Sequence, residues 1–182
     1  DNSYSYICCQ PVASFELNRG TITQQFPDGT KDVFVLENKK LAVKALQSFA
    51  NCFQPQKLPF NFIYNGLFGH ITYDSVEYFE DIEMQAASPE TEIPQIFYQV
   101  FRYVIAINHF KDDLIIFEHE YLPPPASPEG ERSQVESIGL EQMEILIKNR
   151  NFAAYSFKVE KEESSNVSDD QMRSIIQKCI DH

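Results

Sequence analysis

Alternating apolar and polar residues in the first 36 positions predict a series of short strands joined by turns. Gln10-Pro11 parts the first two runs, because proline cannot donate a backbone hydrogen bond to a β-ladder. Pro27-Asp28-Gly29 has the composition of a hairpin turn. The opening is therefore predicted to be a β-meander, with strands at residues 4–9, 12–17, 21–25 and 33–36.

Helical periodicity appears three times. After Asn38, a predicted N-cap, apolar residues recur every four positions, and Pro55 and Pro59 end the pattern. A second helix is predicted over Leu140–Lys148. A third begins at Ser168, where Ser-Asp-Asp-Gln is a capping box, and carries the apolar stripe Met172, Ile175, Ile176, Cys179 and Ile180. We divide the chain into a domain at 1–165 and the start of a further helical segment at 166–182.

The middle of the chain contains further β-patterns. The strongest runs from Ile96 to Phe110, and Lys111-Asp112-Asp113 turns it into a hairpin that pairs Tyr103–His109 with Leu114–His119. Other strands are expected at 60–64, 67–73 and 154–159, with a loop at 121–133 and a linker at 161–167. The predicted fold class is α+β, with largely antiparallel β-sheets packed as a sandwich and helices on the outside.

Charge and length exclude two classes of partner. The formal net charge of −12 would repel a phosphate backbone, which argues against nucleic-acid binding. No apolar run approaches the roughly 20 residues of a membrane helix. No secretory signal is visible. Four cysteines without a C-x-x-C pair favour reduced, mostly buried thiols in a cytoplasmic protein.

Candidate chemistry is sparse. The acidic residues Asp74, Glu77, Glu80, Asp81 and Glu83 could hold a hard metal ion, but a solvated acidic face is the favoured interpretation. His70, His109, His119 and His182 favour structural or surface roles over zinc binding. A Cys–His nucleophilic pair stays open, without a local signature to support it. No glycine-rich phosphate loop is present. The sequence therefore predicts no catalytic, cofactor-binding or metal-binding residue in this chain.

Three stretches, in the right order, resemble the amino-terminal domain of anthranilate synthase component I. Tyr4-Ser5-Tyr6-Ile7 followed by Pro11–Glu16 is similar to the opening strands of that family. Gly66–Glu80 is similar to its glycine–aromatic–Tyr-Asp signature, within which Gly69, Tyr73, Asp74, Tyr78 and Glu80 are the matching residues. The hairpin from Val104 to Phe117 and the helix from Ser168 to Asp181 complete the likeness. Departures are Cys8-Cys9, His70, Glu77 and Asn108, where the family usually has other residue types.

The resemblance implies a parent enzyme, a lyase of tryptophan biosynthesis. It converts chorismate and glutamine-derived ammonia into anthranilate and pyruvate. In such an enzyme Mg²⁺ and chorismate are bound by a carboxyl-terminal domain, which would follow this chain, so the chain itself is expected to be regulatory or structural and inactive alone. A glutamine amidotransferase subunit, component II, is the implied partner and L-tryptophan the implied effector. Tyr4 and Ser5 would flank the effector pocket, and the signature residues would be structural.

Two alternatives stay open at this point. The same domain occurs in aminodeoxychorismate synthase component I of the folate pathway. A stand-alone binding domain without any link to chorismate is the other.

Within the signature, Tyr73, Val76, Tyr78 and Phe79 are expected to pack into the core.

Overall fold

The computed structural model describes residues 4–82, 93–121, 137–149, 165 and 167–181. The chain divides into two compact units, Asp1–Ile147 and Lys148–His182, and each is considered by itself. The predicted strand at 154–159 lies outside the described residues, as do nearly all of the predicted loop at 121–133 and of the linker at 161–167.

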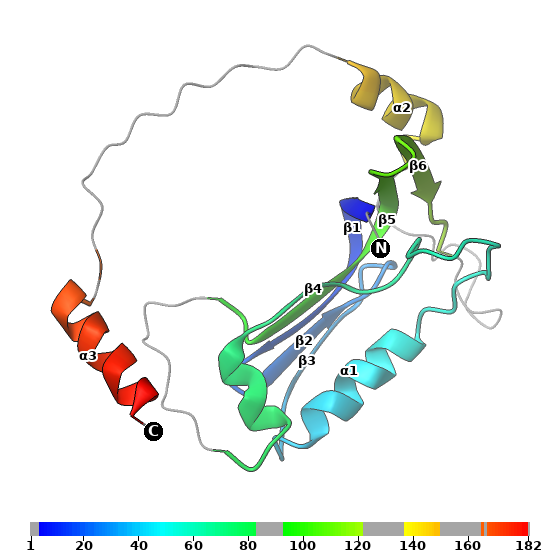
Figure 1. The fold of residues 1–182 in the computed structure, drawn as a ribbon. Coiled ribbons are helices and arrows are strands. Elements are labelled where there is room, and N and C mark those ends of the chain that lie inside the picture. Colours follow the sequence, from blue (N-terminus) through cyan, green and yellow to red (C-terminus); the bar gives the residue numbers. More distant parts are fainter. Residues whose placement is uncertain (1–3, 83–92, 122–136, 150–164, 166, 182) are drawn as a thin grey trace. The chain divides into compact units, whose positions relative to one another are not determined.

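The first unit is built on a six-stranded antiparallel sheet (Figure 1). The strand order is β3-β2-β1-β5-β4. β4 pairs with the first part of β5, and β6 pairs with the last part of β5 along the same edge. This confirms the α+β class. The described strands form one sheet, so the second layer of the expected sandwich is not among them. The strands are β1 (Tyr4–Asn18), β2 (Thr21–Gln25), β3 (Lys31–Val35), β4 (Phe68–Ile71), β5 (Ile96–Asn108) and β6 (Asp113–Glu118).

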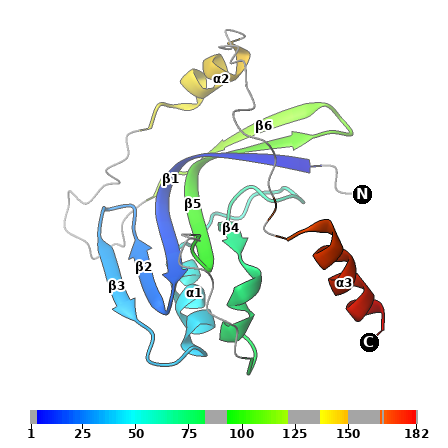
Figure 2. The same ribbon diagram turned by 90° about the vertical axis from the view of Figure 1, so that its left-hand side faces the viewer.

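The predicted break at Gln10-Pro11 is wrong, because β1 is one strand of 15 residues. It pairs with β5 from Tyr4 to Leu17, and the register shifts between Pro11 and Ala13. Gln10 has a φ of 56°, so the chain absorbs the proline in a β-bulge rather than in a turn. The strand bends as it continues past β2 (Figure 2). The predicted hairpin of β5 and β6 is confirmed, with Tyr103 opposite Glu118 and Asn108 opposite Asp113.

Helix α1 (Leu41–Asn51) covers one face of the sheet. Its buried residues Ala42 and Phe49 pack with Phe15, Leu17 and Ile22 in the largest core cluster. Asn38 is not its N-cap as predicted, since Lys40 takes that position and the Asn38 carboxamide instead accepts a hydrogen bond from the Lys40 amide. The local Asx turn and the N-cap compete for the same side-chain oxygen, and here the turn prevails.

The other half of the sheet is covered differently on its two faces. On one face, the segment 58–64 brings Phe62 and Tyr64 against Phe117, Val104 and Ala106. The predicted strand at 60–64 is therefore wrong: these residues form an irregular aromatic segment that packs its side chains on the sheet and pairs with none of the described strands. On the other face, Met143 of α2 (Leu140–Lys148) packs on Tyr103 and Ile105.

On one part of the sheet, no described helix or strand packs against one of the two faces. By strand alternation, the residues of β1, β2 and β5 that face away from α1 are polar or half-exposed. The alternate residues of the same strands, which face α1, are mostly buried. The side chains on the half-exposed face, hereafter the open face, are Ser14, Glu16, Asn18, Thr21, Thr23, Phe97 and Gln99.

The second unit contains α3 (Asp169–Ile180), and its predicted capping box is confirmed. The Ser168 hydroxyl accepts a hydrogen bond from the Gln171 amide, and the Gln171 side chain accepts one from the Ser168 amide. Within the described residues, the apolar stripe of this helix is exposed: Met172 is 47% exposed and Ile180 70%.

Two remaining expectations concern cysteines and membranes. Cys8 and Cys9 are half-buried, but Cys52 and Cys179 are exposed, so the expectation of mostly buried thiols is wrong for those two. Cys52 lies at the C-terminal end of α1, where its thiol donates to the Ser48 carbonyl oxygen. Among the described helices, none combines the length and the apolar character that crossing a membrane requires.

Candidate functional site

The glycine-aromatic segment that was distinctive in sequence forms β4 and a short 3₁₀ helix, η1 (Tyr73–Tyr78). Hydrogen bonds to the Gln95 carbonyl oxygen tie the start of η1 to the beginning of β5. The Thr72 amide donates to the Gln95 carbonyl oxygen at 2.8 Å, and the fully buried Ser75 hydroxyl donates to the same oxygen at 2.5 Å. Because this carbonyl lies immediately before β5, the segment is anchored where β4 and β5 pair.

The side chain of Gln95 then joins three separate parts of the chain. Its carbonyl oxygen accepts from the Tyr78 hydroxyl at 2.7 Å and from the Arg19 amide at 2.9 Å. Its amide nitrogen donates to Glu77 at 2.9 Å. The Tyr78 hydroxyl also accepts from the Gly20 amide at 3.2 Å. We call these residues, Gln95, Tyr78 and Glu77, the Gln95 centre. It links η1, the β1–β2 turn and β5.

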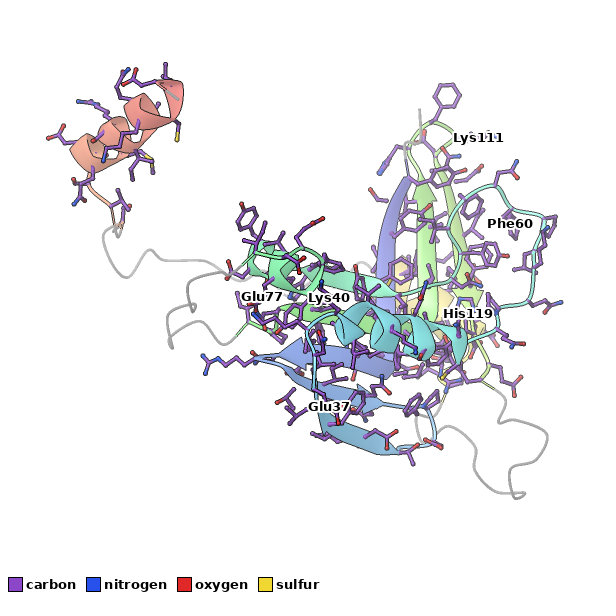
Figure 3. The ribbon with its side chains drawn as sticks, turned by 90° about the horizontal axis from the view of Figure 1, so that it is seen from below. Glu37, Lys40, Phe60, Glu77, Lys111 and His119 are labelled. Atoms are coloured by element: carbon purple, nitrogen blue, oxygen red, sulfur yellow. The ribbon has the colours of Figure 1, made fainter. Side chains whose placement is uncertain are left out.

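Two lysines before α1 hold the acidic side of η1. The Lys39 ammonium lies 2.6 Å from the Glu77 carboxylate, and that of Lys40 lies 2.8 Å from the Asp81 carboxylate. Figure 3 labels Lys40 and Glu77 at the junction of α1 and η1. Among the described residues, no set of three or more metal-ligating side chains comes together. Within the acidic face that was expected, Glu77 and Asp81 bind lysines, Glu80 is exposed, and Glu83 lies outside the described residues.

Around neutral pH, Glu77 stays ionised and Tyr78 stays protonated. The hydrogen bond from Lys39 is the main reason why the pKa of Glu77 lies below its usual value. Burial is the main reason why the pKa of Tyr78 lies above its usual value. A general acid or base works best when its pKa is near the working pH, and both groups are shifted away from it. The centre is suited to holding segments in place rather than to transferring protons.

The structure separates the five signature residues by role. Tyr78 is 3% exposed, as expected of a core residue, whereas Tyr73 is 84% exposed, so its predicted packing is wrong. Tyr73 is the first residue of η1, and its side chain points to solvent while Ser75 and Tyr78 take the buried side. Asp74 lies in the first turn of η1 and Glu80 is exposed after it. Gly69 lies in β4, opposite Tyr98.

Replacing Gln95 by alanine tests the Gln95 centre. Gln95→Ala removes one acceptor and one donor that serve the Tyr78 hydroxyl, the Arg19 amide and Glu77. We expect a loss of about 2 kcal/mol in the free energy of unfolding, because partly buried polar groups lose their partners. Urea unfolding followed by circular dichroism measures it. Gln47→Ala, on the exposed side of α1, is the matched control, and equal stability of the two variants would contradict the assignment.

The two residues predicted to flank an effector pocket lie at the start of β1. The Tyr4 hydroxyl accepts from the Asn108 carboxamide at 2.9 Å, and the Ser5 hydroxyl is 2.6 Å from Nε2 of His109. The Asn108 oxygen also accepts from the amides of Phe110 and Lys111. A hydroxyl next to an imidazole is the arrangement of a nucleophile and its base. Here both groups are exposed, and the described contacts include no carboxylate that orients the imidazole.

His70 and His119 have structural contacts, as the sequence indicated, and His182 lies outside the described residues. Nε2 of His119 lies 2.8 Å from the Tyr64 carbonyl oxygen, and burial lowers the pKa of this imidazole. His119 therefore holds the aromatic segment 58–64 against the sheet. His70 contacts the Pro94 carbonyl oxygen at 3.2 Å. His109 and His119 bind different partners.

A shallow pocket of about 240 Å³ lies between the bulge of β1 and the β2–β3 turn. Val12, Phe26 and Pro27 supply apolar walls, and Ser14, Gln25 and Gln99 supply neutral polar groups. None of the described residues that line it is charged. The pocket is smaller than most ligand sites, and these residues include no cation that would pair with a carboxylate ligand.

Sequence reasoning missed Gln95, Lys39 and Lys40. A lone glutamine before a strand carries no distinctive pattern, so nothing in the sequence could have singled it out. The lysines left only a weak signal: two adjacent lysines precede one helix, and two of the clustered carboxylates, Glu77 and Asp81, lie in and just after another.

Comparison with known proteins shows what the fold resembles. No family model matches the sequence, and none of the curated protein sequences matches it. Among solved structures, the crystal structure of anthranilate synthase component I from Streptococcus pneumoniae TIGR4 is similar to 98% of this chain, with a TM-score of 0.59 and 15% sequence identity. The chain spans 38% of the length of that structure. At this identity, the likeness shows that the chain shares its fold with part of that protein.

Proposed function

We propose that this chain is the amino-terminal part of an anthranilate synthase large subunit, with a regulatory and structural role. The parent enzyme would convert chorismate and glutamine-derived ammonia into anthranilate and pyruvate. The observation that carries the proposal is the extent of the structural likeness, which covers 98% of the chain. The sequence motifs of the opening strands, the signature and the hairpin occur in the order that the family shows.

The polar centres of the chain are consistent with a supporting role. The Gln95 centre ties three segments together with groups whose pKa values are shifted away from neutrality. The open face and the exposed stripe of α3 are surfaces that a further domain could cover. We infer that the catalytic groups and Mg²⁺ belong to a carboxyl-terminal chorismate-binding domain, and that this chain supplies a packing surface for it.

Regulation and partners follow from the same proposal. Tyr4 and Ser5 lie together at the start of β1, with their hydroxyls directed to Asn108 and His109. We infer that this end of the sheet flanks a tryptophan site in the complete enzyme. A glutamine amidotransferase subunit would supply ammonia in the cytoplasm.

Two assays test the proposal. The 182-residue chain, supplied with chorismate, ammonia and Mg²⁺, is expected to form no anthranilate, whereas the protein encoded by the full reading frame forms it. Anthranilate production by the chain alone would contradict the division of roles. Aminodeoxychorismate as the product of the full-length protein would move the chain to the folate enzyme. A reading frame that ends near His182 would favour a stand-alone binding domain.

Ser5 gives the regulatory part its own test. In the full-length enzyme, Ser5→Ala is expected to raise the tryptophan concentration for half-inhibition by about tenfold, the equivalent of one lost hydrogen bond. Ser14→Ala, on the same strand but on the open face, is the matched control. Equal inhibition of the two variants would remove Ser5 from the effector site.

A further inference from the structure

Strand β3 ends the sheet and is unprotected among the described residues. All five of its residues are exposed, and Val33, Phe34 and Val35 are 59%, 41% and 71% exposed. Natural edge strands are usually shielded by proline, a bulge or central charges, because an open edge invites pairing with another strand. The charges of β3, Lys31 and Asp32, lie at its start, and Val33, Phe34 and Val35 have none of these protections. In Figure 2 it lies at the outer side of β2.

The hydrogen-bond pattern shows which backbone groups of β3 are available. The Leu36 amide donates to the Gly20 carbonyl oxygen, and the Phe26 amide donates to that of Thr30. In this register Asp32 and Phe34 also direct their amides and carbonyls toward β2. Lys31, Val33 and Val35 must then direct theirs outward. An added antiparallel strand would have to place its own outward residues opposite these three.

We propose that β3 pairs with β3 of a second copy of this chain, in an antiparallel register centred on Phe34. In that register Val33 lies opposite Val35 of the other copy, and Lys31 lies opposite its Glu37. The outward amides and carbonyls of both strands then meet. The stripe that results on the open face has valines at its centre and a Lys–Glu pair at each end. Glu37, labelled in Figure 3, follows β3 by two residues.

Competing arrangements fit less well. A register centred on Val33 would set Lys31 opposite Val35 and leave both charges without a partner. On the edge of β6, Leu114, Ile116 and Glu118 direct their backbone groups outward, and a register centred on Ile116 would set Glu118 opposite Leu114 of a second copy and leave the charge without a partner. β4 has only four residues and contains Gly69. The proposed pairing does not depend on the function proposed above.

The test is self-association of the 182-residue chain in sedimentation velocity at about 5 to 500 μM, since a small interface forms a concentration-dependent dimer. Glu37→Lys and Lys31→Glu each set like charges opposite one another, and each is expected to weaken the dimer by about tenfold. The double exchange K31E/E37K restores the opposite-charge pairs and is expected to restore the dimerisation. Glu120→Lys and Lys57→Glu, at exposed positions away from β3, match the changes in net charge.

A backbone variant separates strand pairing from charge alone. Val33→Pro removes an outward amide, which β2 does not use, and is expected to abolish dimerisation while the circular dichroism spectrum is kept. A chain that stays monomeric at all concentrations would overturn the proposal. Dimerisation that is equally strong in Glu37→Lys, in Lys31→Glu and in the unchanged chain would overturn it as well. That result is expected if the exposed stripe of α3 forms the dimer.

Discussion

Phe49→Ala is expected to lower the free energy of unfolding by about 3–5 kcal/mol, as for other buried aromatic truncations. Phe49 is 1% exposed, and its ring packs against Phe15, Phe26 and Phe53 at centroid distances of 5.7, 5.7 and 5.3 Å. These partners come from β1, from the β2–β3 turn and from the segment just after α1. Removing the ring would leave a cavity where helix and sheet meet.

Urea unfolding, monitored by circular dichroism, measures this loss. Val43→Ala is the matched control, because Val43 is on the same helix and 39% exposed; we expect it to cost less than about 1 kcal/mol. A loss below about 1.5 kcal/mol for Phe49→Ala would show that α1 contributes little to the core.

Gly69→Ala is expected to cost about 3 kcal/mol, because the added carbon has no space. An ideal Cβ at Gly69 would lie 1.9 Å from the Phe97 carbonyl oxygen and 2.8 Å from the Tyr98 Cα. Both are backbone atoms of the paired strand, so no side-chain rotation relieves the clash. The methyl group would push β4 away from β5 and loosen the anchoring of η1 on Gln95.

Two measurements check this expectation. The unfolding free energy reports the total cost, with His70→Ala on the same strand as the control, expected to cost about 1 kcal/mol or less because His70 is exposed. Hydrogen exchange of the Thr72 and Ser75 amides reports the local effect. Unchanged exchange together with unchanged stability would mean that β4 does not approach β5 as closely as its register indicates.

The structure explains why Gly69 carried the sequence signal and why other signature residues were misjudged. Glycine is required there by a close approach between two strands, a contact that its local sequence does not encode. Tyr73 was expected in the core on its aromatic character alone. The 3₁₀ geometry of η1 instead gives the buried side to Ser75 and Tyr78.

Local patterns predicted those elements that depend on near neighbours. The β5–β6 hairpin, the α1 and α2 helices and the capping box of α3 were all predictable, because turn chemistry, helical periodicity and capping act within a few residues. The sequence predictions were wrong where a residue distant in the sequence determines the local structure. Pro11 could be absorbed into β1 because β5 pairs along both sides of the bulge, and the aromatic run at 60–64 packs by its side chains on Phe117.

The sequence by itself therefore determined the α+β class, the main helices and hairpin, and the acidic character that argues against nucleic acid. Only the tertiary structure decided that Gln95, Lys39 and Lys40 hold η1, that Ser5 meets His109, and that β3 is an open edge. The physical reason is the range of the interactions. Periodicity and capping act between neighbours, whereas Ser5 and His109 are 104 residues apart and meet only because β1 and β5 pair.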